Sequence, residues 1–421
     1  MKLIFFEFGK NMTNHDITFE EEKSFWLETS LSTNFPQLKV GLKVDVAIVG
    51  GGIAGITTAT LLKESGYNVA VIEADRIIKD VTVGTTAKIC VSAGYSYIKY
   101  KLGKDQAQSY ANANMDALDK IAEIIRSHDI DCEFHRLPLY IYNESPKMTS
   151  KFKREFNFVK ELGLPVSLPD DVPLPFKIGP SIKYDDQAQF HPRKYLLSLS
   201  DYIDGDGSYI FEKTNFIDVK EGKVKEVVTD HGSIMADNVV IATNTPVYDP
   251  DDLRNHLHPE GSFVIGLYTN GDFPDGMFIE NEPVHTYRTT PTDKGQMIIV
   301  AGEHSLVDVE DKNVYYDRLE KYAHQHLDVK SVDYRWSSYD STTDDDLPII
   351  GKTSQQGVYV ATGFCFWGML NGTTAGMVIS DLITGKENQY ADIFNPIRFT
   401  REYMAILKLR SAILNLILYF I

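Results

Sequence analysis

A short, nearly all-apolar run begins the regular pattern of this chain. Residues 44–49 (VDVAIV) are typical of a strand that is buried on both faces of a parallel sheet. Residues 53–65 then carry apolar positions at helical spacing, and Gly66 follows where such a helix would end. Residues 68–72 (NVAVI) form a second buried run. The pattern predicts a β-α-β unit with a right-handed crossover.

Helical and alternating patterns fill the rest of the chain. Five prolines within 165–180 forbid regular structure there and indicate a passage between domains. Apolar residues at three- and four-residue spacing predict helices at 105–127, 151–162, 193–203 and 372–384. Buried or alternating runs predict strands at 208–211, 215–219, 224–229, 238–242, 262–269, 277–280, 284–289, 295–300 and 358–361.

The buried strands fall into separate stretches of the chain, which implies a discontinuous domain. We expect an α/β fold in which a Rossmann-like FAD/NAD(P)-binding domain is interleaved with an inserted α+β substrate domain built on an antiparallel sheet. The expected boundaries are 40–100, 190–250 and 340–400 for the nucleotide-binding domain, 101–189 and 251–339 for the substrate domain, 1–39 for an N-terminal extension and 401–421 for an apolar C-terminal tail.

A glycine motif follows the first strand directly. Residues 50–55 read GGGIAG and fit G-x-G-x-x-G. Gly50 permits the tight turn, Gly52 lets the backbone approach a pyrophosphate, and Gly55 lets the helix pack closely on the strand. Glu73 ends the second strand and is placed to accept hydrogen bonds from a ribose diol. A purely structural turn would not require this combination of strand, helix, second strand and acid, so the motif predicts a dinucleotide site.

Composition narrows the class of partner. The chain has 421 residues, 43% of them hydrophobic and 24% charged, which excludes disordered and fibrous proteins. A net charge of −17 repels phosphate backbones, so we expect a small-molecule partner and no nucleic acid. The three cysteines are too few for a disulfide framework and too far apart for a metal pair, which favours a reducing, cytoplasmic location: Cys90, Cys132 and Cys365.

Both ends of the chain carry apolar runs. Residues 1–8 are interrupted by Glu7 and lack a small-residue cleavage site, so we expect no signal peptide. Residues 405–421 contain only Lys408 and Arg410 as charges and reach the lower edge of the length of a membrane span. We expect this tail to dock on the body or on a second subunit, or alternatively to lie in a membrane interface.

Further motifs, in order along the chain, carry a family resemblance. They are residues 44–75, Gly84 to Lys88 (GTTAK), Gln189 to Pro192 (QFHP), residues 239–243 (VVIAT), the D-x-P-x-x-G pattern of Asp346, Pro348 and Gly351, and residues 363–372 (GFCFWGMLNG). Over about residues 24–399 the chain resembles the D-amino-acid-oxidase-like family of FAD-dependent oxidoreductases, which includes glycine, sarcosine and gamma-glutamylputrescine oxidases. It is most similar to a branch that often carries a C-terminal Rieske iron–sulfur domain.

The resemblance implies FAD as the cofactor. The glycine motif and Glu73 would hold its ADP half, and residues 85–88 would line the approach to the flavin. Residues 363–369 would present backbone N–H groups from a helix N-terminus to the flavin N1/O2 side, where reduction leaves negative charge. The implied FAD contacts are Gly50, Gly51, Gly52, Ile53, Ala54, Gly55, Glu73, Ala74, Thr85, Thr86, Ala87, Lys88, Ala242, Thr243, Gly351, Gly363, Phe364, Gly368 and Met369.

The chain departs from the family pattern at three points. Gly84 stands where relatives usually have histidine, so a covalent flavin link there is excluded and we expect non-covalent FAD. Cys365 stands where relatives often have asparagine, and is either a small buried thiol or a redox or flavin-contacting thiol. The Cys-x-His and Cys-x-x-His pairs of a Rieske centre do not occur, so we expect no such domain in this chain.

The implied reaction is hydride transfer from the carbon bearing an amine to flavin N5, followed by hydrolysis of the imine. It requires no strong general base, which makes catalytic residues hard to identify. Arg288 is a candidate for binding a substrate carboxylate, and His191 and Trp336 for the substrate pocket. Their alternatives are a structural arginine, a helix-capping histidine and plain core. Lys88 is a candidate for a flavin or active-site contact.

The substrate and the electron acceptor stay open at this point. The substrate is a small amine or amino acid, and the acceptor is oxygen, a quinone or a redox protein. The alternative function is an electron-transfer or assembly flavoprotein subunit of a larger complex, with residues 405–421 as its contact. Oxidation by NAD is disfavoured, because an NAD enzyme does not need the element at 363–372.

Overall fold

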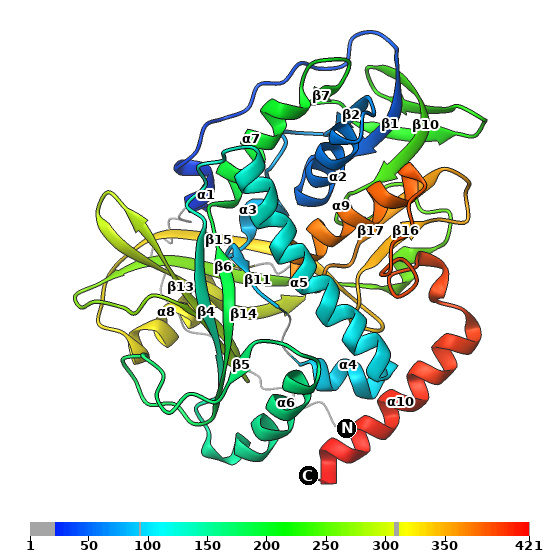
Figure 1. The fold of residues 1–421 in the computed structure, drawn as a ribbon. Coiled ribbons are helices and arrows are strands. Elements are labelled where there is room, and N and C mark those ends of the chain that lie inside the picture. Colours follow the sequence, from blue (N-terminus) through cyan, green and yellow to red (C-terminus); the bar gives the residue numbers. More distant parts are fainter. Residues whose placement is uncertain (1–21, 92–93, 307–310, 421) are drawn as a thin grey trace, which may run out of the picture.

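Two sheets form the framework of the computed structural model, which describes residues 22–91, 94–306 and 311–420 (Figure 1). The first has the order β16-β17-β10-β1-β2-β7, and β9 and β8 extend it from β10. Strands β17, β10, β1, β2 and β7 are parallel. The strands are β1 (Leu42–Val49), β2 (Val69–Ile72), β7 (Tyr209–Phe211), β8 (Phe216–Lys220), β9 (Lys225–Thr229), β10 (Gly232–Ile241), β16 (Ile349–Lys352) and β17 (Val358–Thr362).

The second sheet is mostly antiparallel and has the order β15-β11-β14-β13-β12-β4-β6-β3, with β5 beside β6. Its strands β4 and β12 pair in parallel. The strands are β3 (Lys88–Ile89), β4 (His135–Tyr142), β5 (Val166–Ser167), β6 (Ser181–Gln189), β11 (Leu257–Thr269), β12 (Met277–Asn281), β13 (Val284–Thr292), β14 (Gly295–Leu306) and β15 (Val329–Thr343).

Helices α2, α5, α7 and α9 pack on one another beside the first sheet, while α8 packs on β11 and β14 (Figure 1). The helices are α1 (Phe25–Glu28), α2 (Ile53–Glu64), α3 (Val81–Gly84), α4 (Tyr95–Leu102), α5 (Lys104–Ser127), α6 (Thr149–Glu161), α7 (Pro192–Ile203), α8 (Asn313–His326), α9 (Gly368–Thr384) and α10 (Arg401–Phe420). Short 3₁₀ turns are η1 (Pro146–Met148), η2 (Leu253–His256) and η3 (Pro396–Arg398).

The first sheet confirms the predicted β-α-β unit and the α/β fold class. Strands β1 and β2 pair in parallel from Val46 with Val69 to Val49 with Ile72, and all these positions are buried. Because β10 lies on the other side of β1 and β17 lies beyond it, the loops after β1, β10 and β17 leave the sheet at one edge.

Glycines let two helices of this unit approach closely. A Cβ at Gly372 of α9 would lie 2.7 Å from Ile53 Cγ2, and a Cβ at Gly376 would lie 2.7 Å from Thr57 Cγ2 of α2. Both distances are too short for carbon atoms, so the glycines allow α9 to lie directly on α2.

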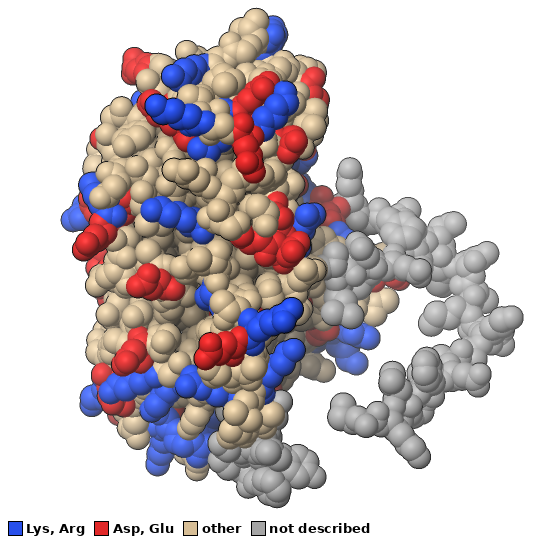
Figure 2. Space-filling view, turned by 90° about the vertical axis from the view of Figure 1, so that its right-hand side faces the viewer, with Lys and Arg blue, Asp and Glu red and all other residues tan. Residues whose placement is uncertain are grey.

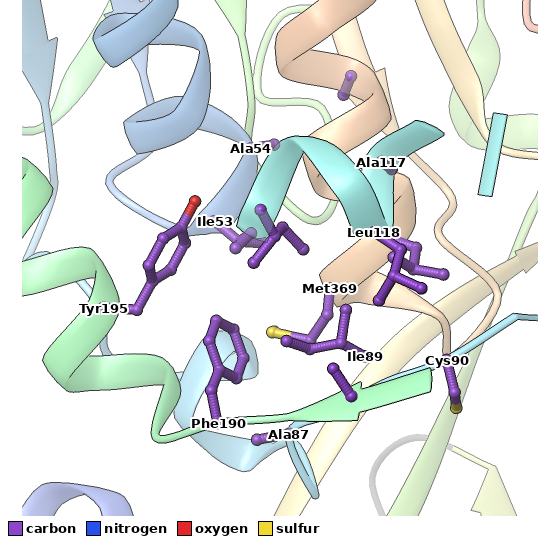
Figure 3. Close-up of a cluster of buried hydrophobic side chains, with 14 of the residues drawn as sticks. Ile53, Ala54, Ala87, Ile89, Cys90, Ala117, Leu118, Phe190, Tyr195 and Met369 are labelled. Atoms are coloured by element: carbon purple, nitrogen blue, oxygen red, sulfur yellow. The ribbon is translucent and has the colours of Figure 1, made fainter. Parts of the chain in front are cut away.

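A buried cluster joins these helices to the second sheet. Figure 3 shows Ile53 of α2, Leu118 of α5 and Met369 of α9 facing Ile89 of β3 and Phe190. All five side chains are at most 5% exposed. Packing at this density holds the glycine loop and the start of β3 in a fixed relation.

Some elements differ from expectation. Helix α9 begins at Gly368, four residues before the predicted start, and β4, β6, α4, α8 and β15 were not predicted. Strand β3 belongs to the second sheet although 88–89 falls within the expected nucleotide-binding stretch 40–100, and α5 packs on α9 although 104–127 falls in the expected substrate domain. The domain boundaries therefore stay a prediction.

The C-terminal helix α10 packs along α4 at the lower end of the molecule (Figure 1). Leu407 is buried, and the Arg410 guanidinium donates to the Lys101 carbonyl at 3.3 Å. Lys and Arg side chains gather at this end in Figure 2. Within the described ranges, no helix combines the length and apolarity needed to span a bilayer.

Candidate functional site

Three loops meet at the carboxyl edge of the first sheet. They follow β1, β10 and β17, and they bring residues 50–54, 242–244, 364 and 366–370 to the wall of one cavity of about 390 Å³. Ligands of open parallel sheets bind at such an edge, where neighbouring loops diverge.

The glycine loop leaves no room for side chains at two positions. Gly50 has φ +112°, and a Cβ there would lie 2.6 Å from the Ala242 carbonyl oxygen. A Cβ at Gly55 would lie 1.9 Å from the Gly50 carbonyl oxygen. Gly52 is the N-cap of α2 and lines the cavity. The loop therefore has the tight turn, the close helix packing and the open backbone that a pyrophosphate requires.

Glu73 lies beside this loop and lines the same cavity. Its Oε2 accepts a hydrogen bond from the Gly51 N–H at 2.9 Å, and its Oε1 accepts one from the Asp75 N–H at 3.1 Å. Burial raises the pKa of Glu73, whereas these two N–H groups act to lower it. Each carboxylate oxygen has a further lone pair, so the side chain can still accept from two ribose hydroxyls.

The N-terminus of α9 faces the middle of the cavity. Phe364, Trp367, Gly368 and Met369 line it. A Cβ at Gly368 would meet no atom within 4 Å, so the space in front of the helix is open. The first turn of a helix has free N–H groups and a positive dipole end, which stabilise negative charge placed there.

An unusual backbone precedes α9. Cys365 and Phe366 have φ of +52° and +66°. The buried Asp340 accepts a hydrogen bond from the Phe366 N–H at 2.7 Å, and burial raises the pKa of Asp340 to about 6. The Cys365 thiol donates to the Gly363 carbonyl at 3.3 Å and does not line the cavity, and burial raises its pKa. This placement favours the buried-thiol alternative for Cys365.

Lys88 lies where the cavity passes from the first sheet to the second. Its Nζ donates to Thr86 Oγ1 at 3.1 Å and to Thr286 Oγ1 at 2.7 Å, and all three residues line the cavity. Burial lowers the pKa of Lys88 to about 7, and the charge of Arg288 acts in the same direction.

A row of side chains across four strands forms the far wall. Strand register pairs Ile279 with Thr286, Thr286 with Ala301, and Ala301 with Val264, and all four line the cavity. We call Ile279, Thr286, Ala301 and Val264 the four-strand row. His304 stands at the rim with its ring edge on Phe366, at 5.0 Å between ring centres. Sequence reasoning missed these residues, because alternation predicts strands but not their register.

Most of the predicted FAD contacts come together at the cavity. Five do not line it: Gly55, Ala74, Ala87, Gly351 and Gly363. Gly351 lies in β16, where a Cβ would be 3.2 Å from Pro396 Cδ. Those that line it are Gly50, Gly51, Gly52, Ile53, Ala54, Glu73, Thr85, Thr86, Lys88, Ala242, Thr243, Phe364, Gly368 and Met369.

The expected substrate role of Arg288 stays a prediction, and its contacts favour the structural alternative. Its side chain is 2% exposed and does not line the cavity. The guanidinium donates to the carbonyls of Thr86, Ala87 and Phe190 at 3.2, 2.9 and 3.1 Å. Arg288 therefore ties β13 to the start of β3, which is the structural alternative.

His191 and Trp336 also lie outside the cavity lining, so their expected pocket roles stay predictions. His191 is buried as the N-cap of α7, where its Nδ1 accepts from the Lys194 N–H at 3.3 Å. Burial lowers the pKa of His191 to about 3. The Trp336 indole N–H donates to the Gly84 carbonyl at 3.1 Å. The capping and core alternatives fit these contacts.

Comparisons with known proteins agree with this geometry. The chain is 32% identical to the putative Rieske 2Fe-2S iron-sulfur protein YhfW of Bacillus subtilis, over 92% of this chain and 78% of that protein. It is 23% identical to gamma-glutamylputrescine oxidoreductase of Escherichia coli, over 85% of this chain and 87% of that one. The fold matches glycine oxidase from Geobacillus kaustophilus with a TM-score of 0.70 and 19% identity, over 85% of this chain and 99% of that one. A family model described as FAD dependent oxidoreductase (DAO) matches residues 45–382, and the chain therefore belongs to this family of FAD-dependent oxidoreductases.

Proposed function

We propose that the chain oxidises the C–N bond of a small amine or amino acid with non-covalently bound FAD. The observation that carries the proposal is the continuity of one cavity from Glu73 and the glycine loop to the four-strand row. Bound FAD would accept the hydride from the substrate carbon, and water would then hydrolyse the imine.

The residues present fit FAD on both sides of the cavity. The glycine loop provides a cradle that a Cβ would fill, and Glu73 offers acceptors to a ribose. The open space before Gly368 lets the N-terminus of α9 approach a flat ring system. Backbone N–H groups there would stabilise the negative charge of the reduced ring.

The second sheet would supply the substrate side. Ile279, Ala301 and Val264 are apolar and would exclude water from the reacting carbon. The task of these residues is to orient the C–H bond, because the cofactor performs the demanding chemistry. Two relatives support the substrate class, since by name one acts on gamma-glutamylputrescine, an amine, and the other on glycine, an amino acid.

Packing around Gly84 supports non-covalent binding. A Cβ at this residue would lie 2.5 Å from Cβ of Ser338, so β15 occupies the place of a side chain. Acid precipitation of the holoenzyme should therefore release FAD into the supernatant, and flavin that stays with the pellet would show a covalent link.

Product analysis tests the proposed reaction. The holoenzyme is incubated with a panel of amines and amino acids and an artificial electron acceptor, and carbonyl products are trapped with a hydrazine. The proposal predicts a carbonyl compound together with ammonia or an amine from at least one member. Turnover of alcohols or hydroxy acids without any amine oxidation would overturn it.

The electron acceptor and the cellular location of the enzyme are also part of the proposed function. We propose a cytoplasmic enzyme that passes electrons to oxygen, a quinone or a redox protein, with α10 as a contact for a membrane surface or a subunit. Exposed apolar side chains on α10 favour such a contact: Ile406, Leu409 and Ile413. If the holoenzyme oxidises no substrate but exchanges electrons with a partner protein, the alternative of an electron-transfer subunit takes its place.

A further inference from the structure

We propose that Lys88 binds the carboxylate of the substrate, so that the substrate is an amino acid and not a simple amine. The inference rests on the proposed function and narrows it. The Lys88 ammonium lines the cavity beside the four-strand row, where it donates a hydrogen bond to Thr286 of that row.

Lys88 has no acidic partner. Its Nζ donates to the hydroxyls of Thr86 and Thr286. Among the described residues, no Asp or Glu oxygen lies within 4.0 Å of the Lys88 Nζ, so this ammonium forms no ion pair. An ammonium has three donors, and two hydroxyls occupy two of them. One N–H and the whole positive charge are left for a ligand in the cavity.

The surroundings of Lys88 favour binding of an anion next to its ammonium. Burial opposes the charge on Lys88, and Arg288 adds a second positive charge nearby. A buried charge is costly unless it is paired and hydrogen-bonded. A carboxylate would supply both the countercharge and the missing acceptor, whereas an uncharged group would supply only the acceptor.

The other cations near the cavity are already engaged. Arg76 pairs with Glu212 at 3.1 Å, and Lys79 pairs with Asp75, both at the end that holds Glu73. Arg288 lies outside the cavity lining, and its guanidinium donates hydrogen bonds to backbone carbonyls. Of the described lysines and arginines that line the cavity, Lys88 alone lacks a carboxylate partner.

The four-strand row indicates the chemical character of the substrate beyond its carboxylate. From Thr286 the wall continues through Ile279 on one side and through Ala301 and Val264 on the other. These side chains carry no charge and offer no hydrogen bond beyond the Thr286 hydroxyl. A carboxylate held at Lys88 would therefore place an uncharged, largely aliphatic remainder along the row.

Binding of simple carboxylates tests the inference without turnover. Propionate is titrated into the holoenzyme and followed by the visible absorption of the bound flavin, with propionamide as the uncharged analogue of the same shape. We expect propionate to bind and propionamide not to bind. Lys88→Met should weaken the binding of propionate by about 30-fold or more, as expected for loss of one partner of a buried charge pair. Lys183→Met, which removes a lysine paired with Asp185 on β6, is the matched control and should change nothing.

Kinetics with matched substrates complete the test. For an amino acid that reduces the enzyme, Lys88→Met should raise KM strongly, and wild-type enzyme should prefer that amino acid over its decarboxylated amine. Equal propionate binding by wild type and Lys88→Met, or a preference for the amine, would overturn the role of Lys88 while leaving amine oxidation intact. If Lys88→Met loses FAD, Thr286→Val takes its place, and unchanged propionate binding by that variant contradicts the inference. Absence of any reduction by amines and amino acids would instead contradict the proposed function.

Discussion

Lys88 is a titratable residue on the substrate side of the cavity, beside the four-strand row. Its pKa, lowered by burial from 10.5 to about 7, means that the ammonium is present at lower pH and is lost as pH rises. Burial lowers the pKa of the Arg288 guanidinium to about 9, so it keeps its charge while Lys88 titrates. Burial raises the pKa of Cys90 to about 12, so this neighbouring thiol stays neutral. Of these three groups, Lys88 is therefore the one whose charge changes near neutral pH.

The affinity for propionate should fall as pH rises. A bound carboxylate stabilises the ammonium, so the pKa of Lys88 will be higher in the complex than in the free site. At higher pH the dissociation constant should increase by about tenfold per pH unit. Titrations at a series of pH values measure this dependence, and Lys88→Met should show none of it. An affinity that increases with pH in the wild-type enzyme would be inconsistent with carboxylate binding by Lys88.

Gly52 gives the sharpest test of the cofactor site. A Cβ at this position would lie 3.0 Å from Thr82 Oγ1, and a larger side chain would project where a pyrophosphate approaches α2. Gly52→Val should therefore yield folded protein without FAD, measured by the ratio of flavin to protein and by circular dichroism. Gly271→Val is the control, because a Cβ there meets nothing within 4 Å. A fully loaded Gly52→Val protein would refute the loop as the phosphate site.

Single residues differed in how well the sequence identified them. Gly50, Gly52 and Glu73 could be predicted, because backbone geometry and ribose binding restrict those positions to particular residue types. Arg288 could not, because its role depends on which acceptors surround its guanidinium, and these come from segments far away in sequence. A charged residue on a predicted strand therefore does not by itself indicate a substrate contact.

Helices and strands could be predicted from the sequence where the elements that pack together are close in the chain. The unit β1-α2-β2 closes within about thirty residues, and its apolar runs specify it directly. The second sheet is different, because β15 pairs with β11 and β4 pairs with β12 across long separations in sequence. Register across such pairs depends on tertiary packing, and it alone creates the four-strand row.

Helix α10 should be dispensable for the cofactor. Helix α10 packs on α4, and within it Leu407 is buried and the Arg410 guanidinium donates to the Lys101 carbonyl. Tyr403, whose hydroxyl donates to Asp345 at 2.6 Å, precedes the segment 405–421, and no described residue of α10 lines the cavity. Deletion of 405–421 should keep the FAD content and cost about 2 kcal/mol of stability from the lost leucine burial. Flavin content and thermal unfolding measure both effects. Loss of FAD on deletion would show that the tail supports the cofactor domain.

At the scale of the whole molecule, charge is unevenly distributed. Helices α4, α6 and α10 carry nine basic and three acidic residues, whereas the chain has a net charge of −17. Tyr97 and Tyr100 are exposed on α4, which packs beside α10 with its exposed aliphatic side chains (Figure 1). A basic face with exposed apolar side chains is typical of proteins that bind anionic lipid surfaces.

Vesicle sedimentation tests this face. The holoenzyme should pellet with vesicles that contain phosphatidylglycerol, less so at high salt, and not with phosphatidylcholine alone. Deletion of 405–421 should weaken the binding. If the protein ignores anionic vesicles and instead forms a dimer that the deletion disrupts, the face is a subunit contact.

Anaerobic reduction tests the central claim most directly. The purified holoenzyme is mixed without oxygen with amino acids that have uncharged side chains and with their decarboxylated amines, and the visible flavin absorption is recorded. The cavity that joins the FAD-binding loops to Lys88 and the four-strand row predicts bleaching by at least one amino acid, at lower concentration than its amine. Protein that carries FAD but stays oxidised with every amine and amino acid would contradict the account.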